Sequence, residues 1–159
     1  MTPSSPFAPD VEQRVRASFA RQELINTLNG EIALVSPGEL HISAPFDKRF
    51  TQQDGFLHAG IVTTLLDSAS RRDPACGTGC GYASYTLIPA NSRVLSVEFK
   101  VNLLNPAQGE RFRAEGRVVK SGKTISVCEG RLFALQKGQE TLVAMMQATM
   151  ICIREVQHN

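Results

Sequence analysis

Between residues 93 and 156 the chain contains four strand-like segments that are separated only by short turns. In the first of them, Leu95, Val97 and Phe99 alternate with polar or charged neighbours, a pattern typical of a strand with one buried face. Turns as short as Ser121-Gly122 and Lys137-Gly138 join only antiparallel strands. We therefore expect an antiparallel sheet with strands over 93–104, 111–120, 124–136 and 141–156.

The first half of the chain contains two segments with the apolar spacing of amphipathic helices. One is predicted over 10–28, and its apolar stripe could either cover a tunnel entrance or serve for packing alone. The other begins near His58 and continues until Pro74 and the glycines around it interrupt the pattern. Short strands are predicted between the two helices, over 31–36 and 39–46. A helix wrapped by an antiparallel sheet of this kind is an α+β arrangement.

The composition is that of one globular domain: 159 residues, 42% of them hydrophobic, with a net charge of +2. So small a charge gives no bulk attraction for nucleic acid or for an anionic membrane. We expect the domain to span 10–156, between a disordered segment at 1–9 and a tail at 157–159. No signal segment or membrane span is recognisable, so we expect a cytoplasmic protein with reduced cysteines.

Two motifs resemble functional sites but fail on spacing. Cys76 and Cys80 form the only close cysteine pair, and no histidine lies near them, so no metal site is predicted. The segment from Gly116 to Thr124 has five residues before its Gly-Lys-Thr, where a phosphate-binding loop has four. It also leads into a strand, so a hairpin turn is the better interpretation.

The candidate chemistry lies at the start of the second helix. His58, Ala59 and Gly60 would occupy its first turn, where unpaired backbone N–H groups can stabilise an oxyanion. Asp67 lies nine residues further along, although a lone aspartate on a helix is more often simply solvated. Nine residues correspond to about half a rotation and roughly 13 Å of helix. If both ends are catalytic, each site must therefore be shared by two copies of the chain. His41 is expected to be structural and His158 to lie in the tail.

The run TQQDGFLHAGIVTTLLDSA, with VLSVEFKVNLLNPAQGERF and GRVVKSGKT after it, resembles the PaaI-type acyl-CoA thioesterases of the hotdog fold. The resemblance covers about residues 25–153 and implies a long central helix wrapped by five to six antiparallel strands, with an extra N-terminal helix. It also implies a homodimer or homotetramer that needs no cofactor, since coenzyme A is part of the substrate. The substrate would be a medium-chain or aromatic acyl-CoA.

The resemblance assigns roles residue by residue. Asp67 would be the nucleophile or general base, with a pKa raised by its partly apolar surroundings. The N–H of Ala59 would polarise the thioester carbonyl beside Gly60, while His58 would fix the turn or a water molecule. Gln52 would position the water or the carbonyl, and Ser96 would assist the water or the acid from the partner subunit. Expected contacts with coenzyme A comprise Leu103, Lys120, Ser121, Gly122, Lys123 and Thr124.

Three features depart from the family pattern. Ala59 replaces a glycine, Gln52 replaces an asparagine, and an insertion of about nine residues is expected at 71–79. We expect the insertion to loop outward, but it could instead displace Asp67. The alternative function is therefore a catalytically impaired acyl-CoA-binding hotdog protein. A hotdog dehydratase or hydratase, and a plain α+β interaction domain, are weaker alternatives.

Overall fold

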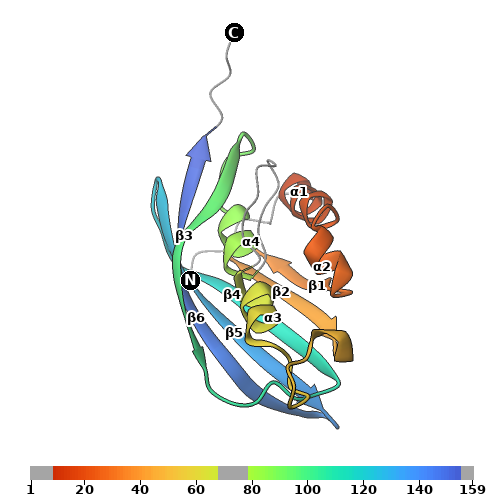
Figure 1. Ribbon diagram of the computed structural model, residues 1–159. Coiled ribbons are helices and arrows are strands. Elements are labelled where there is room, and N and C mark those ends of the chain that lie inside the picture. Colours follow the sequence, from red (N-terminus) through yellow and green to blue (C-terminus); the bar gives the residue numbers. More distant parts are fainter. Residues whose placement is uncertain (1–8, 68–78, 155–159) are drawn as a thin grey trace.

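The computed structural model describes residues 9–67 and 79–154. The chain order begins with two helices and ends with four long strands (Figure 1). The elements are α1 (Pro9–Phe19), α2 (Glu23–Thr27), β1 (Glu31–Ser36), β2 (Glu39–Pro45), the 3-10 turn η1 (Lys48–Phe50), α3 (Ala59–Asp67), α4 (Gly79–Tyr85), β3 (Ser92–Leu103), β4 (Arg111–Ser121), β5 (Ile125–Gln136) and β6 (Gln139–Arg154).

All six strands form one antiparallel sheet in the order β1-β2-β4-β5-β6-β3. The strand prediction is confirmed, with boundaries that shift by a few residues at most. Lys137 and Gly138 both have positive φ, 50° and 77°, as the tight β5–β6 turn requires. Strand β3 pairs only with β6 and forms one edge of the sheet.

The helices α3 and α4 lie on the concave face of the sheet (Figure 1). The inner faces of the central strands supply the core, including Ile42, Phe112, Leu132 and Met146. At Gly130 the helices come so close that an added Cβ would lie 3.1 Å from Leu66 and 3.2 Å from Cys80. In the described residues, α3 and α4 occupy the place of the predicted central helix. The predicted insertion at 71–79 lies almost wholly outside the described residues.

The helix predicted over 10–28 is in fact two helices, α1 and α2. Gln22 between them has non-helical dihedral angles, φ −81° and ψ 88°. The spacing of the apolar residues gives a physical reason for this break between α1 and α2. In one continuous helix Ile25 would lie about 120° away from Phe19, whereas the break allows both side chains to be buried.

The N-terminal helix packs against α4. Ser18 and Tyr82 share a buried hydrogen bond of 2.9 Å, and the rings of Phe19 and Tyr82 lie 5.8 Å apart. Arg14 stacks over the ring of Tyr85 and donates to the carbonyl oxygen of Ile88. The helix was predicted either to cover a tunnel entrance or to serve for packing alone, and the described contacts show packing.

The regular alternation predicted along β3 is broken by a bulge. Ser96 pairs with Met150 and Glu98 with Thr149, so Val97 has no partner of its own in β6. A bulge reverses which residues face inward. Before the bulge, Val94 and Ser96 face the helices. After the bulge, the inward-facing residues are Phe99, Val101 and Leu103, because each pairs with a core residue of β6. These core residues are Ala148, Met146 and Ala144.

Candidate active site

The loop that leads into α3 is held in shape by hydrogen bonds at both ends. Asp47 accepts from the backbone and the side chain of Arg49, and this contact lowers the pKa of the Asp47 carboxyl group. A β-bridge joins Thr51 to Leu57, and the N–H of His58 donates to the carbonyl oxygen of Phe50 at 2.9 Å. The start of the helix is therefore fixed relative to the rest of the loop.

His58 caps α3. Its Nδ1 accepts a hydrogen bond of 3.0 Å from the N–H of Gly60, as an N-cap side chain does. A Cβ at position 60 would lie 3.2 Å from that same nitrogen, which favours glycine there. Of the backbone N–H groups of Ala59 and Gly60, that of Gly60 is therefore already hydrogen-bonded. The N–H of Ala59 has no acceptor in the described part of the chain.

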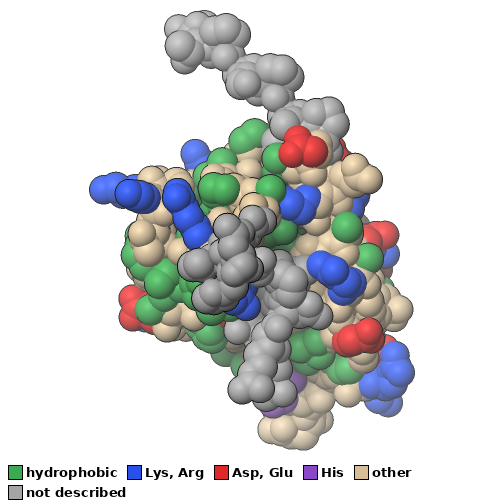
Figure 2. Space-filling view, turned by 90° about the horizontal axis from the view of Figure 1, so that it is seen from above, with side chains coloured by type: hydrophobic (Ala, Val, Ile, Leu, Met, Phe, Trp, Pro, Cys, Tyr) green, Lys and Arg blue, Asp and Glu red, His purple; other side chains and the backbone are tan. Residues whose placement is uncertain are grey.

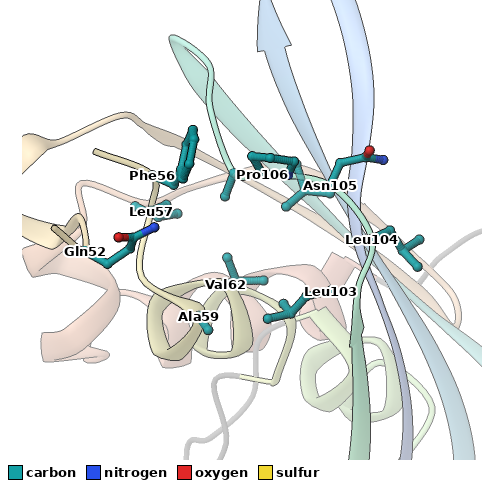
Figure 3. Close-up of a pocket in the computed structure, with 11 residues that line it drawn as sticks. Gln52, Phe56, Leu57, Ala59, Val62, Leu103, Leu104, Asn105 and Pro106 are labelled. Carbon is teal, nitrogen blue, oxygen red and sulfur yellow. The ribbon is translucent and has the colours of Figure 1, made fainter. Parts of the chain in front are cut away.

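Gln52 lies at the start of the loop and Ala59 directly after its end, and the two residues line the same pocket. Its Oε1 accepts a 2.7 Å hydrogen bond from the N–H of Asp54. That bond fixes the amide, because only the NH₂ group remains to face away from the turn. In Figure 3 the amide nitrogen is on the side of Leu57 and the pocket.

A pocket of about 400 Å³ opens next to these two residues. The loop before α3, the helix itself and the segment that follows β3 surround it (Figure 3). Most of its walls are apolar, and none of the described residues that line it is charged. They are Gln52, Phe56, Leu57, Ala59, Val62, Leu103, Leu104, Asn105, Pro106, Ala107 and Val143. Gly60 and His58 instead line a separate hollow of about 250 Å³.

Asp67 is the last residue of α3, and its side chain is held by the sheet. It is only 8% exposed, and its Oδ1 accepts a 2.7 Å hydrogen bond from the hydroxyl of Ser96. The resemblance implied that Ser96 assists the water or the acid of the partner subunit, and the structure shows a contact between Ser96 and Asp67 of the same chain. Met150, which pairs with Ser96, places its Sδ 3.4 Å from the same hydroxyl.

Cys80 adds a buried thiol near this carboxylate. Burial is the main cause that raises its pKa, and the charge of Asp67 contributes in the same direction. The pKa of Cys128 is likewise raised by burial. Neither residue is suited to act as a thiolate nucleophile. Within 9–67 and 79–154, no three His, Cys, Asp or Glu side chains gather as a metal site.

The structure thus divides the predicted site residues among four locations, one of which is the separate hollow beside His58 and Gly60. Gln52, Ala59 and Leu103 meet at the pocket, whereas Asp67 and Ser96 meet away from its lining. The fourth location is the β4–β5 turn with Lys120, Ser121, Gly122, Lys123 and Thr124, where Thr124 accepts from the N–H of Cys152 at 2.7 Å. This turn lies at the end of the molecule where β6 ends, because Ile125 pairs with Ile151, and Lys and Arg side chains lie on that face together with Asp and Glu side chains (Figure 2).

Sequence reasoning missed several pocket residues. Phe56, Pro106 and Val143 line the pocket, yet no spacing rule singles them out. Sequence reasoning also missed the acidic partner of His41, whose Nε2 lies 2.8 Å from Glu39 Oε1. Residues two apart in a strand share a face, so the sequence did contain that signal.

The described residues contain no helix that is both long and apolar enough to cross a membrane. The sequence profile of the thioesterase superfamily matches residues 75–141. The chain is also similar to the crystal structure of a thioesterase family protein from Silicibacter pomeroyi, with 45% identity and a TM-score of 0.83 over 91% of this chain and 99% of that one.

Two more distant structures share the fold. One is the PaaI protein of Escherichia coli, from the phenylacetic acid degradation operon, with 14% identity, a TM-score of 0.75 and coverage of 92% and 96%. The other is a thioesterase from Haemophilus influenzae, with 19% identity, a TM-score of 0.73 and coverage of 88% and 90%. A six-stranded sheet wrapped around helices, together with 45% identity over nearly the whole of a thioesterase family protein, shows that this chain belongs to the thioesterase superfamily and has its hotdog fold.

Proposed function

We propose that the protein hydrolyses medium-chain or aromatic acyl-CoA thioesters to the free acid and coenzyme A. The observation that carries this proposal is the buried carboxylate of Asp67 at the end of α3, which accepts a 2.7 Å hydrogen bond from Ser96 of strand β3. Burial without a function would cost stability, because a carboxylate removed from water loses its hydration. Thioester hydrolysis needs such a group to act on water or on the carbonyl carbon.

The second requirement is a donor for the oxyanion. The Ala59 N–H at the start of α3 and the amide NH₂ of Gln52 converge on the same pocket. With Asp67 as general base, a water molecule gives a proton to the carboxylate while its oxygen forms a C–O bond to the thioester carbonyl carbon, and the negative charge moves to the carbonyl oxygen. The carbonyl then re-forms as the C–S bond breaks, and coenzyme A leaves as a thiol that takes the proton from Asp67. Donors of this kind lower the energy of the charged intermediate.

These two half-sites belong to different protomers in the proposed enzyme. Helix geometry separates Ala59 from Asp67 within one chain by about 12 Å along the axis. Strand β3 offers the means of association, because it is an edge strand with Val97 58% and Phe99 45% exposed. We infer a homodimer in which Asp67 of one protomer faces Ala59 of its partner, alone or within a tetramer of two such dimers.

The binding-only alternative rested on the expected insertion. Asp67 is positioned by Ser96 from the sheet, so its location does not depend on a helix that continues past it. This favours a working acid over a displaced one. The β4–β5 turn, with Lys123 at its tip, is proposed to bind a phosphate of coenzyme A.

The test is thiol release from short, medium, long and phenylacetyl thioesters of coenzyme A, with Asp67→Asn as the variant. We expect the wild-type protein to turn over at least one of them, and the variant to lose about 1,000-fold or more in kcat while still binding substrate. Asp54→Asn, an exposed loop aspartate, is the matched control and should be active. Binding of acyl-CoA without turnover by the wild-type protein would instead establish the binding-only alternative.

A further inference from the structure

The pocket beside Ala59 has an exposed rim and a closed, apolar floor. Leu103 and Leu104 at the rim are 56% and 47% exposed. The floor consists of four buried side chains, none more than 6% exposed. They are Leu57, Val62, Ala107 and Val143.

Backbone hydrogen bonds hold this floor in place. Leu57 donates to the carbonyl oxygen of Ala107 at 3.0 Å. The carbonyl oxygen of Val143 accepts from Leu104 at 2.8 Å and from Asn105 at 3.2 Å. The depth of the pocket is therefore set by the size of the side chains rather than by the position of a mobile loop.

The described side chains of the floor contain no hydrogen-bonding or charged partner for a charged ligand group. Among the described residues that line the pocket, only Gln52 and Asn105 have polar side chains. Gln52 lies beside Ala59, where the thioester carbonyl would bind. Asn105 donates to the carbonyl oxygen of Leu142 at 2.8 Å, and its amide points away from the pocket in Figure 3. A carboxylate on the floor would be buried without a partner, which is strongly unfavourable.

We propose that this floor is the subsite for the far end of the acyl chain, that it accepts only uncharged chain ends, and that the size of Ala107 sets the longest chain that fits. The inference rests on the proposed function, because the Ala59 N–H and the Gln52 amide fix which end of the acyl group is near the rim. Ala107 is the smallest floor side chain, so added atoms there shorten the pocket most directly. Val143, 1% exposed, is the position where lost atoms would deepen it.

The test uses binding rather than turnover. Calorimetry with S-alkyl-CoA thioethers, from butyl to dodecyl, measures affinity without hydrolysis. We expect affinity to rise about fourfold per methylene up to a limit and then to fall. In Ala107→Val the limit should move to shorter chains by roughly the two carbons that valine adds, and in Val143→Ala it should move to longer chains. S-(5-carboxypentyl)-CoA should bind at least about 100-fold more weakly than S-hexyl-CoA.

The matched control is Ala33→Val, the same substitution on an exposed position of β1, which should leave the limit unchanged. The assignment of the floor is overturned if the limit stays the same in folded Ala107→Val and Val143→Ala, or if the carboxylate-ended ligand binds as well as the uncharged one. If the wild-type protein binds none of the thioethers, the proposed function itself is overturned. The two failures are therefore distinguishable.

Discussion

At the scale of single residues, the side-chain amide of Gln52 shows how one hydrogen bond selects a chemical role. The sequence left two roles open, because a glutamine can position water through its oxygen or donate to a carbonyl through its nitrogen. The bond from Asp54 N–H occupies Oε1, and the NH₂ group faces the pocket (Figure 3). We therefore expect Gln52 to donate to the thioester oxygen beside the Ala59 N–H.

Gln52→Glu tests that role. Its carboxylate can still accept from Asp54, so the loop and the melting temperature should change little. It removes the donor and places a negative charge next to the developing oxyanion, so we expect kcat to fall by about 100- to 1,000-fold. Thiol-release kinetics at saturating substrate would measure the loss. Gln53→Glu, an exposed neighbour, should retain kcat, and a fully active Gln52→Glu enzyme would contradict the donor role.

At the scale of elements, the close contact of the helices with the sheet depends on one glycine. An added methyl group at Gly130 would lie 3.1 Å from Leu66 Cδ2 and 3.2 Å from Cys80 Sγ, closer than ordinary carbon contacts. Leu66 precedes Asp67, so any shift of α3 at this point also moves the acid.

We expect Gly130→Ala to lower the free energy of unfolding by about 1–3 kcal/mol and to reduce kcat. Gly81→Ala is the matched control: it lies within α4, and apart from the backbone of that helix its Cβ would meet no atom of the described residues within 4 Å. That variant should be stabilised by about 0.5–1 kcal/mol, because alanine favours the helix. Urea denaturation would measure both. Equal effects of the two variants would show that close packing at Gly130 is unimportant.

The elements also show how far the sequence could be interpreted. Strand positions and turns were predictable, because alternation and Gly-containing turns are local signals. The bulge at Val97 was not, since it depends on the pairing with β6. Asp67, Ala59 and Gln52 were predicted as site residues from spacing and family resemblance, and their catalytic roles stay a prediction. The pocket floor was not, because Leu57, Ala107 and Val143 come together only through tertiary hydrogen bonds.

At the scale of the whole molecule, the two half-sites make a quantitative prediction about mixed dimers. Asp67→Asn inactivates one half-site. Ala59→Pro removes the N–H of the other, and proline is tolerated at the first position of a helix. A heterodimer of the two variants has one site in which both halves are intact. Random exchange of subunits should therefore restore about a quarter of the wild-type activity.

The measurement is thiol release after the two inactive proteins are unfolded together and refolded. Each variant refolded alone should stay inactive, which serves as the control. No recovery in a mixture that is shown by native mass spectrometry to contain heterodimers would mean that each site lies within one chain, and the shared site would be abandoned.

The open edge of β3 has one more consequence. A single protomer has unpaired backbone groups along this strand and leaves Val97, Phe99 and Leu103 in water, which is the surface on which misassembly begins. If the proposed homodimer is the active form, dilution would both abolish activity and expose this edge to aggregation. Newly made chains of that dimer would be protected only after two of them associate, so activity would require a protein concentration at which the dimer forms.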